Sequence, residues 1–135
     1  MLEKPIHGWS HISIASWNDR CSYLDDVPVM LFEALEQAVA TGRPVAVELD
    51  AEGYEYTIVF NSYAVFIITG TDEGYSLTVC EDIRLNNLLW KLAEDVRRDI
   101  DDWVSWGYED LEVTQMNERR TMLLAHCENA THFGR

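Results

Sequence analysis

Several groups of residues in this chain have types and spacings that could support chemistry. His7 and His11 are four residues apart, a spacing that brings two imidazoles together on a helix. They stand at the start of a predicted strand, where that spacing does not direct both rings to one metal ion. His126 is next to Cys127, and neighbouring residues of a helix point in different directions. We therefore expect no metal site and no other cofactor.

Two further segments resemble parts of known sites. Asp99, Asp101 and Asp102 resemble a cation cluster, but a calcium loop places its acids at alternating loop positions, whereas these lie in a predicted helix. The segment 70–74 resembles part of a phosphate-binding loop, yet it joins two predicted antiparallel strands and its two acids would repel a phosphate. The motifs GxSxG, GxGxxG, GxxxxGK[ST] and HExxH are absent. We therefore expect a protein that is not an enzyme.

The centre of the chain carries negative charge without positive charge. Between Arg43 and Arg84 there is no lysine or arginine, but there are eight acids: Glu48, Asp50, Glu52, Glu55, Asp72, Glu73, Glu81 and Asp82. This is the one property of the sequence that points beyond folding, towards a positively charged partner.

The composition limits the classes of function. The 135 residues are sufficient for a single domain, and 24 acids against 10 bases give a formal net charge of −14. Such a charge disfavours binding to nucleic acid or to anionic lipid, and it could steer a basic partner into contact. A solvated surface explains the same acidity without any partner.

The sequence also favours a cytoplasmic location. No window approaches the ~20 consecutive apolar residues that a membrane span needs, and the start of the chain lacks a signal-peptide pattern. The three cysteines are odd in number and contain no CxxC, which suits reduced thiols in a cytosol.

The elements that would position the acidic residues follow from hydrophobic periodicity. Alternation predicts strands, first at 9–16 and then at 45–49, 54–60, 63–69 and 75–80, with a turn-rich bridge at 17–20. The third strand of the central four is almost continuously apolar, so we expect it to be covered on both faces. Short connections between these strands predict an antiparallel meander.

Helices are predicted on both sides of the meander. Asp25 and Asp26 could cap a helix that has Pro28 in its first turn and ends at Gly42. A stripe of apolar residues predicts a long helix from about Leu85 to Trp106, and Gly107 should end it. A weaker pattern predicts a short helix at 116–127, followed by a frayed tail at 128–135. The expected fold class is α+β, a single domain over 1–135, with an antiparallel sheet of about five strands packed by an N-terminal helix and by one long and one short C-terminal helix.

Two sets of residues are candidates for contact with a partner. The first set lies on the predicted hairpin tips: Asp50, Glu52, Tyr54, Glu55, Asp72 and Glu73. The second set lies at the end of the long helix: Asp99, Asp102 and Trp106. Trp106 could be a partly exposed anchor, whereas Trp103 continues the buried stripe, so we expect core packing for Trp103. Tyr54 and Tyr56 could equally be aromatic anchors or cross-strand pairs that stabilise the sheet.

Three segments of the sequence look familiar when taken in order: 22–28 (SYLDDVP), 47–56 (VELDAEGYEY) and 65–69 (VFIIT). Over roughly residues 9–105 the chain resembles small acidic bacterial immunity proteins, including the partners of contact-dependent growth inhibition toxins. The resemblance implies an antidote that binds one basic toxin domain, often a nuclease, and blocks it stoichiometrically. It assigns no contact residues, because these proteins share no binding motif.

Two other functions remain open at this point. A secretion-type chaperone is also small, acidic and α+β, and would expose large apolar grooves for an effector segment. An inhibitor that mimics nucleic acid would need carboxylates spaced like phosphates along a rod, and the clustering of acids in loops argues against it.

Overall fold

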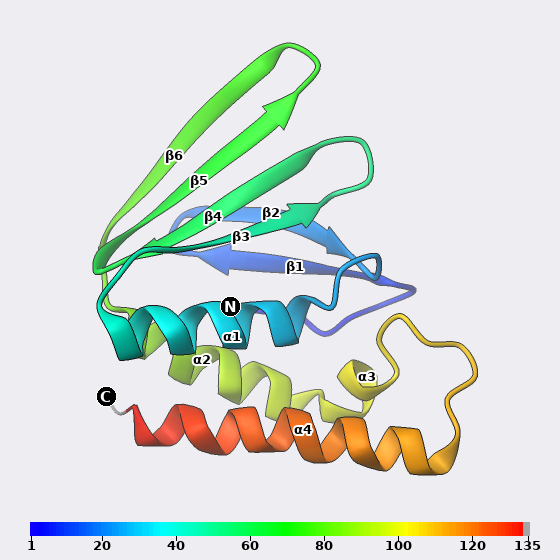
Figure 1. Cartoon of the computed structure of the whole chain (residues 1–135). Helices are drawn as coiled ribbons and strands as arrows, with labels where there is room; N and C mark the ends of the chain where they lie inside the picture. The colour runs from blue at the N-terminus through cyan, green and yellow to red at the C-terminus, as the bar shows by residue number, and fades with distance from the viewer. Residues whose placement is uncertain (134–135) are drawn as a thin grey trace.

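The computed structural model describes residues 1–133, in which two antiparallel sheets stand on a layer of helices (Figure 1). The elements in chain order are β1 (Trp9–Ile14), β2 (Trp17–Ser22), α1 (Val27–Thr41), β3 (Val45–Asp50), β4 (Glu55–Asn61), β5 (Tyr63–Thr71), β6 (Gly74–Ile83), α2 (Leu85–Arg98), α3 (Ile100–Val104) and α4 (Val113–His132). The predicted α+β class is confirmed.

The main sheet is the expected meander, with strand order β3-β4-β5-β6 and every pair antiparallel. The predicted fifth strand does not join this sheet. The segment expected to be a turn-rich bridge is β2, which pairs with β1 in a separate two-stranded sheet. The sequence of β2, WNDRCS, is too polar to predict a strand from hydrophobic periodicity. The strand is held by its pairing with β1 and by its contacts with the main sheet.

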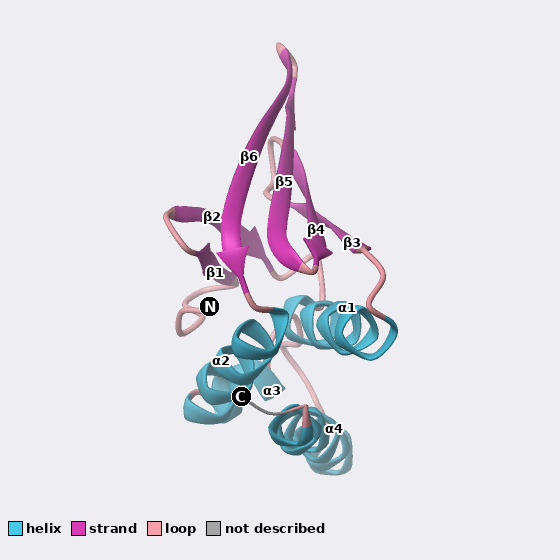
Figure 2. Cartoon of the chain, turned by 90° about the vertical axis from the view of Figure 1, so that its left-hand side faces the viewer, coloured by secondary structure: helices cyan, strands magenta, loops and turns pink. Residues whose placement is uncertain are grey.

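The β1–β2 hairpin covers part of the inner face of the main sheet, the face that carries Tyr56, Val65 and Ile67 (Figure 2). The Trp17 and Tyr56 rings meet edge to face with centroids 5.4 Å apart, and the Tyr56 hydroxyl donates a hydrogen bond of 2.8 Å to the Arg20 carbonyl. The Cys80 thiol lies 3.6 Å from the Ile14 carbonyl oxygen. The buried apolar side chains form one cluster to which both sheets and all four helices of the described chain contribute.

Within residues 1–133 no element covers the outer face of the main sheet in this way. Val65 and Ile67 of β5 point inward and are fully buried, but Ile68 points outward and is 39% exposed. The expectation that β5 is covered on both faces is therefore wrong. The apolar run of β5 is continuous because both of its faces carry hydrophobic side chains. The inner face is packed against the core, and the outer face is open to solvent.

Helix α1 ends as predicted, because Gly42 adopts a left-handed φ of 68° and its N–H bonds to the Ala38 carbonyl at 2.9 Å. Its start differs from the prediction. Asp26 occupies the N-cap position but makes no side-chain capping bond. Its carboxylate instead accepts hydrogen bonds of 2.8 and 2.9 Å from the two terminal nitrogens of Arg119. An intramolecular ion pair thus replaces the expected cap.

The helices after the sheet differ from the predicted lengths. The long helix breaks at Asp99 into α2 and the five-residue α3, and no glycine or proline marks the break. Helix α4 has 20 residues and is the longest among those described, where a short helix was predicted. Residues 128–132, expected to be frayed, are helical because Ala130 is buried in the core, and residues 134–135 of the predicted tail lie outside the described residues.

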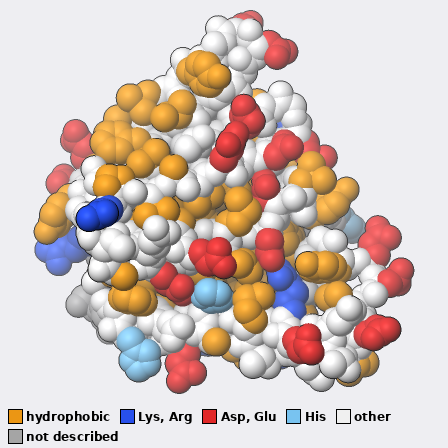
Figure 3. Space-filling view, in the orientation of Figure 1, with side chains coloured by type: hydrophobic (Ala, Val, Ile, Leu, Met, Phe, Trp, Pro, Cys, Tyr) orange, Lys and Arg blue, Asp and Glu red, His pale blue; other side chains and the backbone are white. Residues whose placement is uncertain are grey.

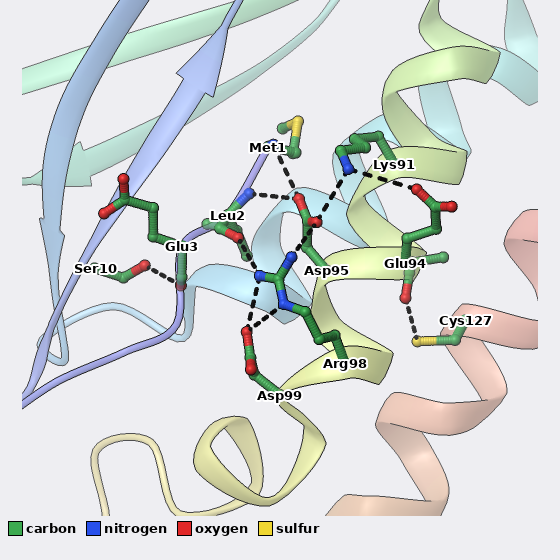
Figure 4. A network of polar contacts seen from close by, with 11 residues as sticks. Met1, Leu2, Glu3, Ser10, Lys91, Glu94, Asp95, Arg98, Asp99 and Cys127 are labelled. Carbon is green, nitrogen blue, oxygen red and sulfur yellow. Dashed lines mark hydrogen bonds and ion pairs between the residues drawn. The ribbon is translucent and has the colours of Figure 1, made fainter.

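The N-terminal segment is fixed to α2 by a buried carboxylate (Figure 4). Asp95 accepts hydrogen bonds from the Leu2 amide at 3.0 Å and pairs with the Met1 ammonium at 2.9 Å. Arg98 pairs with the same carboxylate at 3.1 Å and with Asp99 at 2.8 Å. Acids near the end of α2 are therefore part of the folded framework.

Candidate functional site

The two predicted hairpin tips meet at one end of the main sheet. Glu55 at the start of β4 pairs with Gly70 near the end of β5, so the β3–β4 turn and the β5–β6 turn lie at the same end (Figure 1). Between them is a cleft of about 380 Å³, lined by Asp50, Gly53, Tyr54, Glu55, Gly70, Thr71, Asp72 and Tyr75. The fold thus brings together four of the six residues of the first predicted set. Glu52 and Glu73 are exposed in the adjoining turns.

The carboxylates of this acidic cleft have no cationic partner within residues 1–133. Every ion pair within residues 1–133 lies in the helices, the N-terminal segment, β1 or the residues next to the helices. None of these pairs includes Asp50, Glu55 or Asp72. The same holds for Glu48, Glu52, Glu73, Glu81 and Asp82. Arg20 of β2 reaches the β3–β4 turn through backbone carbonyls and offsets part of this charge. The carboxylates still outnumber this one cation, and such a concentration of like charges attracts cations from outside.

The β3–β4 side of the cleft is held in place by hydrogen bonds. The Asp50 carboxylate accepts the Glu52 N–H at 2.7 Å, and the Asp50 N–H donates to the Asp25 carboxylate at 2.7 Å. The Arg20 guanidinium donates to the Ala51 carbonyl at 2.8 Å and to the Glu52 carbonyl at 3.0 Å. The turn is therefore presented as a rigid surface.

Tyr54 forms part of the wall of the cleft. Its hydroxyl donates a short hydrogen bond to the Asp19 carboxylate, and the Arg20 guanidinium lies 5.1 Å from its ring centroid. Burial raises the pKa of the Tyr54 phenol, and the hydrogen bond to Asp19 raises it further. Tyr54 is thus a neutral, fixed side chain that joins the cleft to the β1–β2 hairpin. Tyr56 is buried in the core and lies opposite Leu49 and Thr69, so it is neither an exposed anchor nor half of a cross-strand tyrosine pair.

The second predicted set does not join the cleft. Asp99 pairs with Arg98 at 2.8 Å (Figure 4). Asp102 lies 4.0 Å from the Lys4 ammonium, so both acids have cations beside them. The expected exposure of Trp106 is wrong: it is 4% exposed, and its Nε1–H donates to the Asp25 carbonyl at 2.8 Å. The turn that follows α3, in which the Trp106 N–H donates to the Trp103 carbonyl at 3.3 Å, packs the two indole rings together with centroids 5.0 Å apart. Trp103 is fully buried, as predicted.

Sequence reasoning missed an apolar surface next to the cleft. Side chains of β5 and β6 on the outer face are exposed, with Tyr75 at 82%, Leu77 at 63% and Val79 at 45%. Figure 3 shows hydrophobic side chains gathered over these strands with acidic side chains beside them. The alternation of β6 revealed its two faces, but the sequence could not indicate that the more hydrophobic of them faces solvent.

A second hollow lies where β6 leads into α2. It has a volume of about 660 Å³ and mostly apolar walls, lined by Asp82, Ile83, Arg84, Asn87, Leu88, Trp90 and Lys91. Arg84 and Lys91 give it positive as well as negative charge. It therefore differs in character from the acidic cleft.

Two of the three histidines singled out in the sequence, His11 and His126, make carboxylate contacts. His11 lies 3.3 Å from Glu3, and His126 lies 2.8 Å from Glu36 and stacks on Phe32. Within residues 1–133, no three histidine, cysteine or acidic side chains are grouped so that they could hold a metal ion. Among the same residues, no helix has the length and apolar character needed to cross a membrane.

Comparisons with known proteins give no match: no protein-family model, no curated protein and no solved structure matches this chain.

Proposed function

We propose that this chain is an immunity protein, an antidote that binds a basic bacterial toxin domain and blocks it stoichiometrically. The observation that carries the proposal is the acidic cleft, where Asp50, Glu55 and Asp72 converge without a cationic partner in the described chain. A domain that binds phosphates presents lysines and arginines, and a rigid carboxylate surface can occupy such a site.

The distribution of charge supports an outward role for the cleft. After the end of α2 the carboxylates of Asp99 and Asp102 have Arg98 and Lys4 beside them, whereas those of the β3–β4 and β5–β6 hairpins are gathered and left without ion pairs among residues 1–133. Opposite charges on two partners accelerate their encounter and exclude partners of the same sign. An antidote that must capture a toxin quickly gains from both effects.

Co-expression with the toxin domain encoded next to this chain tests the proposal, with growth rescue as the measurement. We expect the wild-type chain to restore growth. A folded protein that does not rescue would refute the antidote function and favour the second candidate described below.

A charge-reversal pair tests the site. Glu55→Lys with Asp72→Lys should slow association with the toxin domain about tenfold or more, because the steering field at the cleft is reversed. The matched control is Glu33→Lys with Glu118→Lys, exposed acids on α1 and α4 that give the same change in net charge. Equal association rates for the two pairs would remove the cleft from the interface.

A secretion-type chaperone is the second candidate, and the apolar hollow beside α2 is the observation that favours it. A chaperone would bind an extended effector segment there. Substitution of Leu88 by glutamate should then abolish binding of an effector segment, whereas an antidote that uses the acidic cleft should be unaffected.

A further inference from the structure

Strand β6 is an open edge of the main sheet. It is the longest strand among the described residues, pairs with β5 on one side, and has no strand on its other side (Figure 2). Its far half projects beyond the helices together with β5 (Figure 1). The unpaired N–H and C=O groups of such an edge are a template for another strand.

Both faces of the projecting half are accessible. Tyr75 and Leu77 are exposed on the outer face, and Ser76 is exposed on the inner face. The Tyr75 ring lies over Gly70 so closely that a Cβ on Gly70 would come within 2.9 Å of it.

The opposite edge of the same sheet is protected, and β6 is not. Strand β3 is short, follows Pro44, and carries the exposed charges of Glu48 and Asp50. Proteins use prolines, charges and short strands to prevent pairing at edges. From Gly74 to Cys80, β6 contains no charged residue and no proline.

The charges around β6 select the kind of strand that could pair with it. Asp72 and Glu73 lie at one end and Glu81 and Asp82 at the other, and none of them takes part in an ion pair within the described residues. An antiparallel second copy would bring the acids at one end of its strand towards those at the opposite end of this one. With a net charge of −14 on each chain, self-pairing is opposed, and a strand with basic ends is favoured.

We propose that the β6 edge accepts an additional β-strand from a basic partner protein. Main-chain hydrogen bonds would extend the sheet, and apolar side chains of the added strand would pack beside Leu77 and Val79. Lysines or arginines at the ends of the added strand would contact the four acids that flank the apolar part of β6. The inference rests on the proposed function in that the strand belongs to the same toxin domain that meets the acidic cleft.

A synthetic peptide tests the edge without the toxin. The probe alternates valine and threonine and has lysine pairs at both ends, and its binding to the full chain is measured by fluorescence anisotropy. Two control peptides have the same sequence with alternate backbone amides N-methylated, or glutamate in place of lysine. We expect about tenfold or greater loss of affinity for each control, because the first cannot pair and the second is repelled. Equal affinity for the N-methylated peptide would overturn the proposal.

A matched pair of protein variants locates the binding. Leu77→Lys places a charge on the open edge and should weaken probe binding about tenfold, whereas Ala46→Lys places the same charge on the outer face of β3 and should change it less than about twofold. Both positions are exposed, so both variants should fold. Equal effects of the two variants would contradict strand addition at β6.

The outcomes separate this inference from the proposed function. Growth rescue without probe binding would overturn strand addition and leave the antidote function intact. Probe binding that Leu77→Lys weakens, without growth rescue, would support the β6 edge and refute the antidote. Sedimentation equilibrium should show a monomer, and a dimer that Leu77→Lys dissociates would show that a second copy occupies the edge.

Discussion

Asp95 shows how a carboxylate of this acidic chain contributes to folding. Its side chain is 3% exposed and contacts the Met1 ammonium, the Leu2 amide, Lys91 and Arg98. Burial raises the pKa of this carboxyl, but the hydrogen bonds from the Met1 ammonium and the Leu2 amide and the nearby charges outweigh burial, so the pKa lies below its usual value. The folded protein therefore favours the ionised form.

Substitution of Asp95 by asparagine should lower the free energy of unfolding by about 3 kcal/mol at neutral pH, because it leaves a buried ammonium group without its counter-charge. Since the folded pKa is lowered, this stabilisation is present above the unfolded pKa and is lost as the pH falls through the folded pKa. Urea denaturation at neutral and acidic pH should show the difference between wild type and variant shrinking in acid. Glu94→Gln, an exposed neighbour, is the control, and a difference that does not change with pH would contradict this account.

Trp106 has a role in folding that its position in the sequence does not reveal. Trp106→Phe should lower the free energy of unfolding by about 1–2 kcal/mol, because it removes the hydrogen bond to the Asp25 carbonyl and leaves a small cavity. Thermal or urea denaturation measures the loss. Association with a basic partner should not change, and slower association at unchanged stability would restore Trp106 to the interface.

Among the elements, α4 is joined to the start of α1 by one side chain. The buried Arg119 makes two hydrogen bonds to Asp26, bonds to the Trp103 carbonyl at 3.2 Å, and lies 5.5 Å from the Tyr108 ring centroid. A planar guanidinium can satisfy these acceptors together, whereas a lysine ammonium cannot. In the sequence Arg119 lies within the weakly predicted helix at 116–127, and nothing there indicates its partners. The fold brings Asp26 and the Trp103 carbonyl to it.

Arg119→Met should lower the free energy of unfolding by about 2 kcal/mol, less than for a fully buried pair because Asp26 retains contact with water. Arg119→Lys should recover only part of this loss. Chemical denaturation measures both. Arg120→Met on the same helix is the comparison, because it removes a partly exposed ion pair with Asp101 instead of the buried one with Asp26. Full recovery by lysine would mean that charge, rather than the guanidinium geometry, holds the two helices together.

The β5–β6 hairpin is the element with the least support from the rest of the fold. Its far half has exposed side chains on both faces, so its amides should exchange with solvent faster than those of β4, which is paired on both sides. Hydrogen exchange followed by mass spectrometry measures this difference. Binding of a basic strand should protect residues 74–80, and unchanged exchange in a saturated complex would contradict the strand-addition model.

For the molecule as a whole, negative charge is distributed unevenly between the two ends. Around α2 and α3 the carboxylates of Asp95, Asp99, Asp101 and Asp102 have cations beside them, whereas those of the cleft at the sheet end have no ion pair within residues 1–133. Such an arrangement produces a field directed at the hairpin tips, which is felt over a Debye length of about 8 Å at physiological salt.

Raising the salt from about 0.05 to about 0.5 M should slow association of the wild-type chain with a basic partner, because screening weakens steering. The Glu55→Lys, Asp72→Lys variant should show a weaker dependence on salt than the Glu33→Lys, Glu118→Lys control. Stopped-flow measurements give the slopes. Parallel slopes would mean that net charge alone governs the encounter.

The sequence by itself determined the α+β class, the four strands of the meander, and the end of α1 at Gly42, because these follow from local periodicity and from one residue with a left-handed backbone. It also located the acidic hairpin tips, since a turn between alternating strands is a local signal. In an antiparallel meander with short connections, alternate turns lie at the same end of the sheet. The β3–β4 and β5–β6 turns therefore had to lie together.

Tertiary structure alone decided which surfaces are buried. The polar strand β2, the break at Asp99, the burial of Trp106 and the open outer face of β5 and β6 all depend on partners distant in the sequence. An amphipathic pattern defines two faces of an element but does not state which of them another element will cover. That choice is made by long-range packing, and it separates the carboxylates that stabilise this fold from those that remain available to a partner.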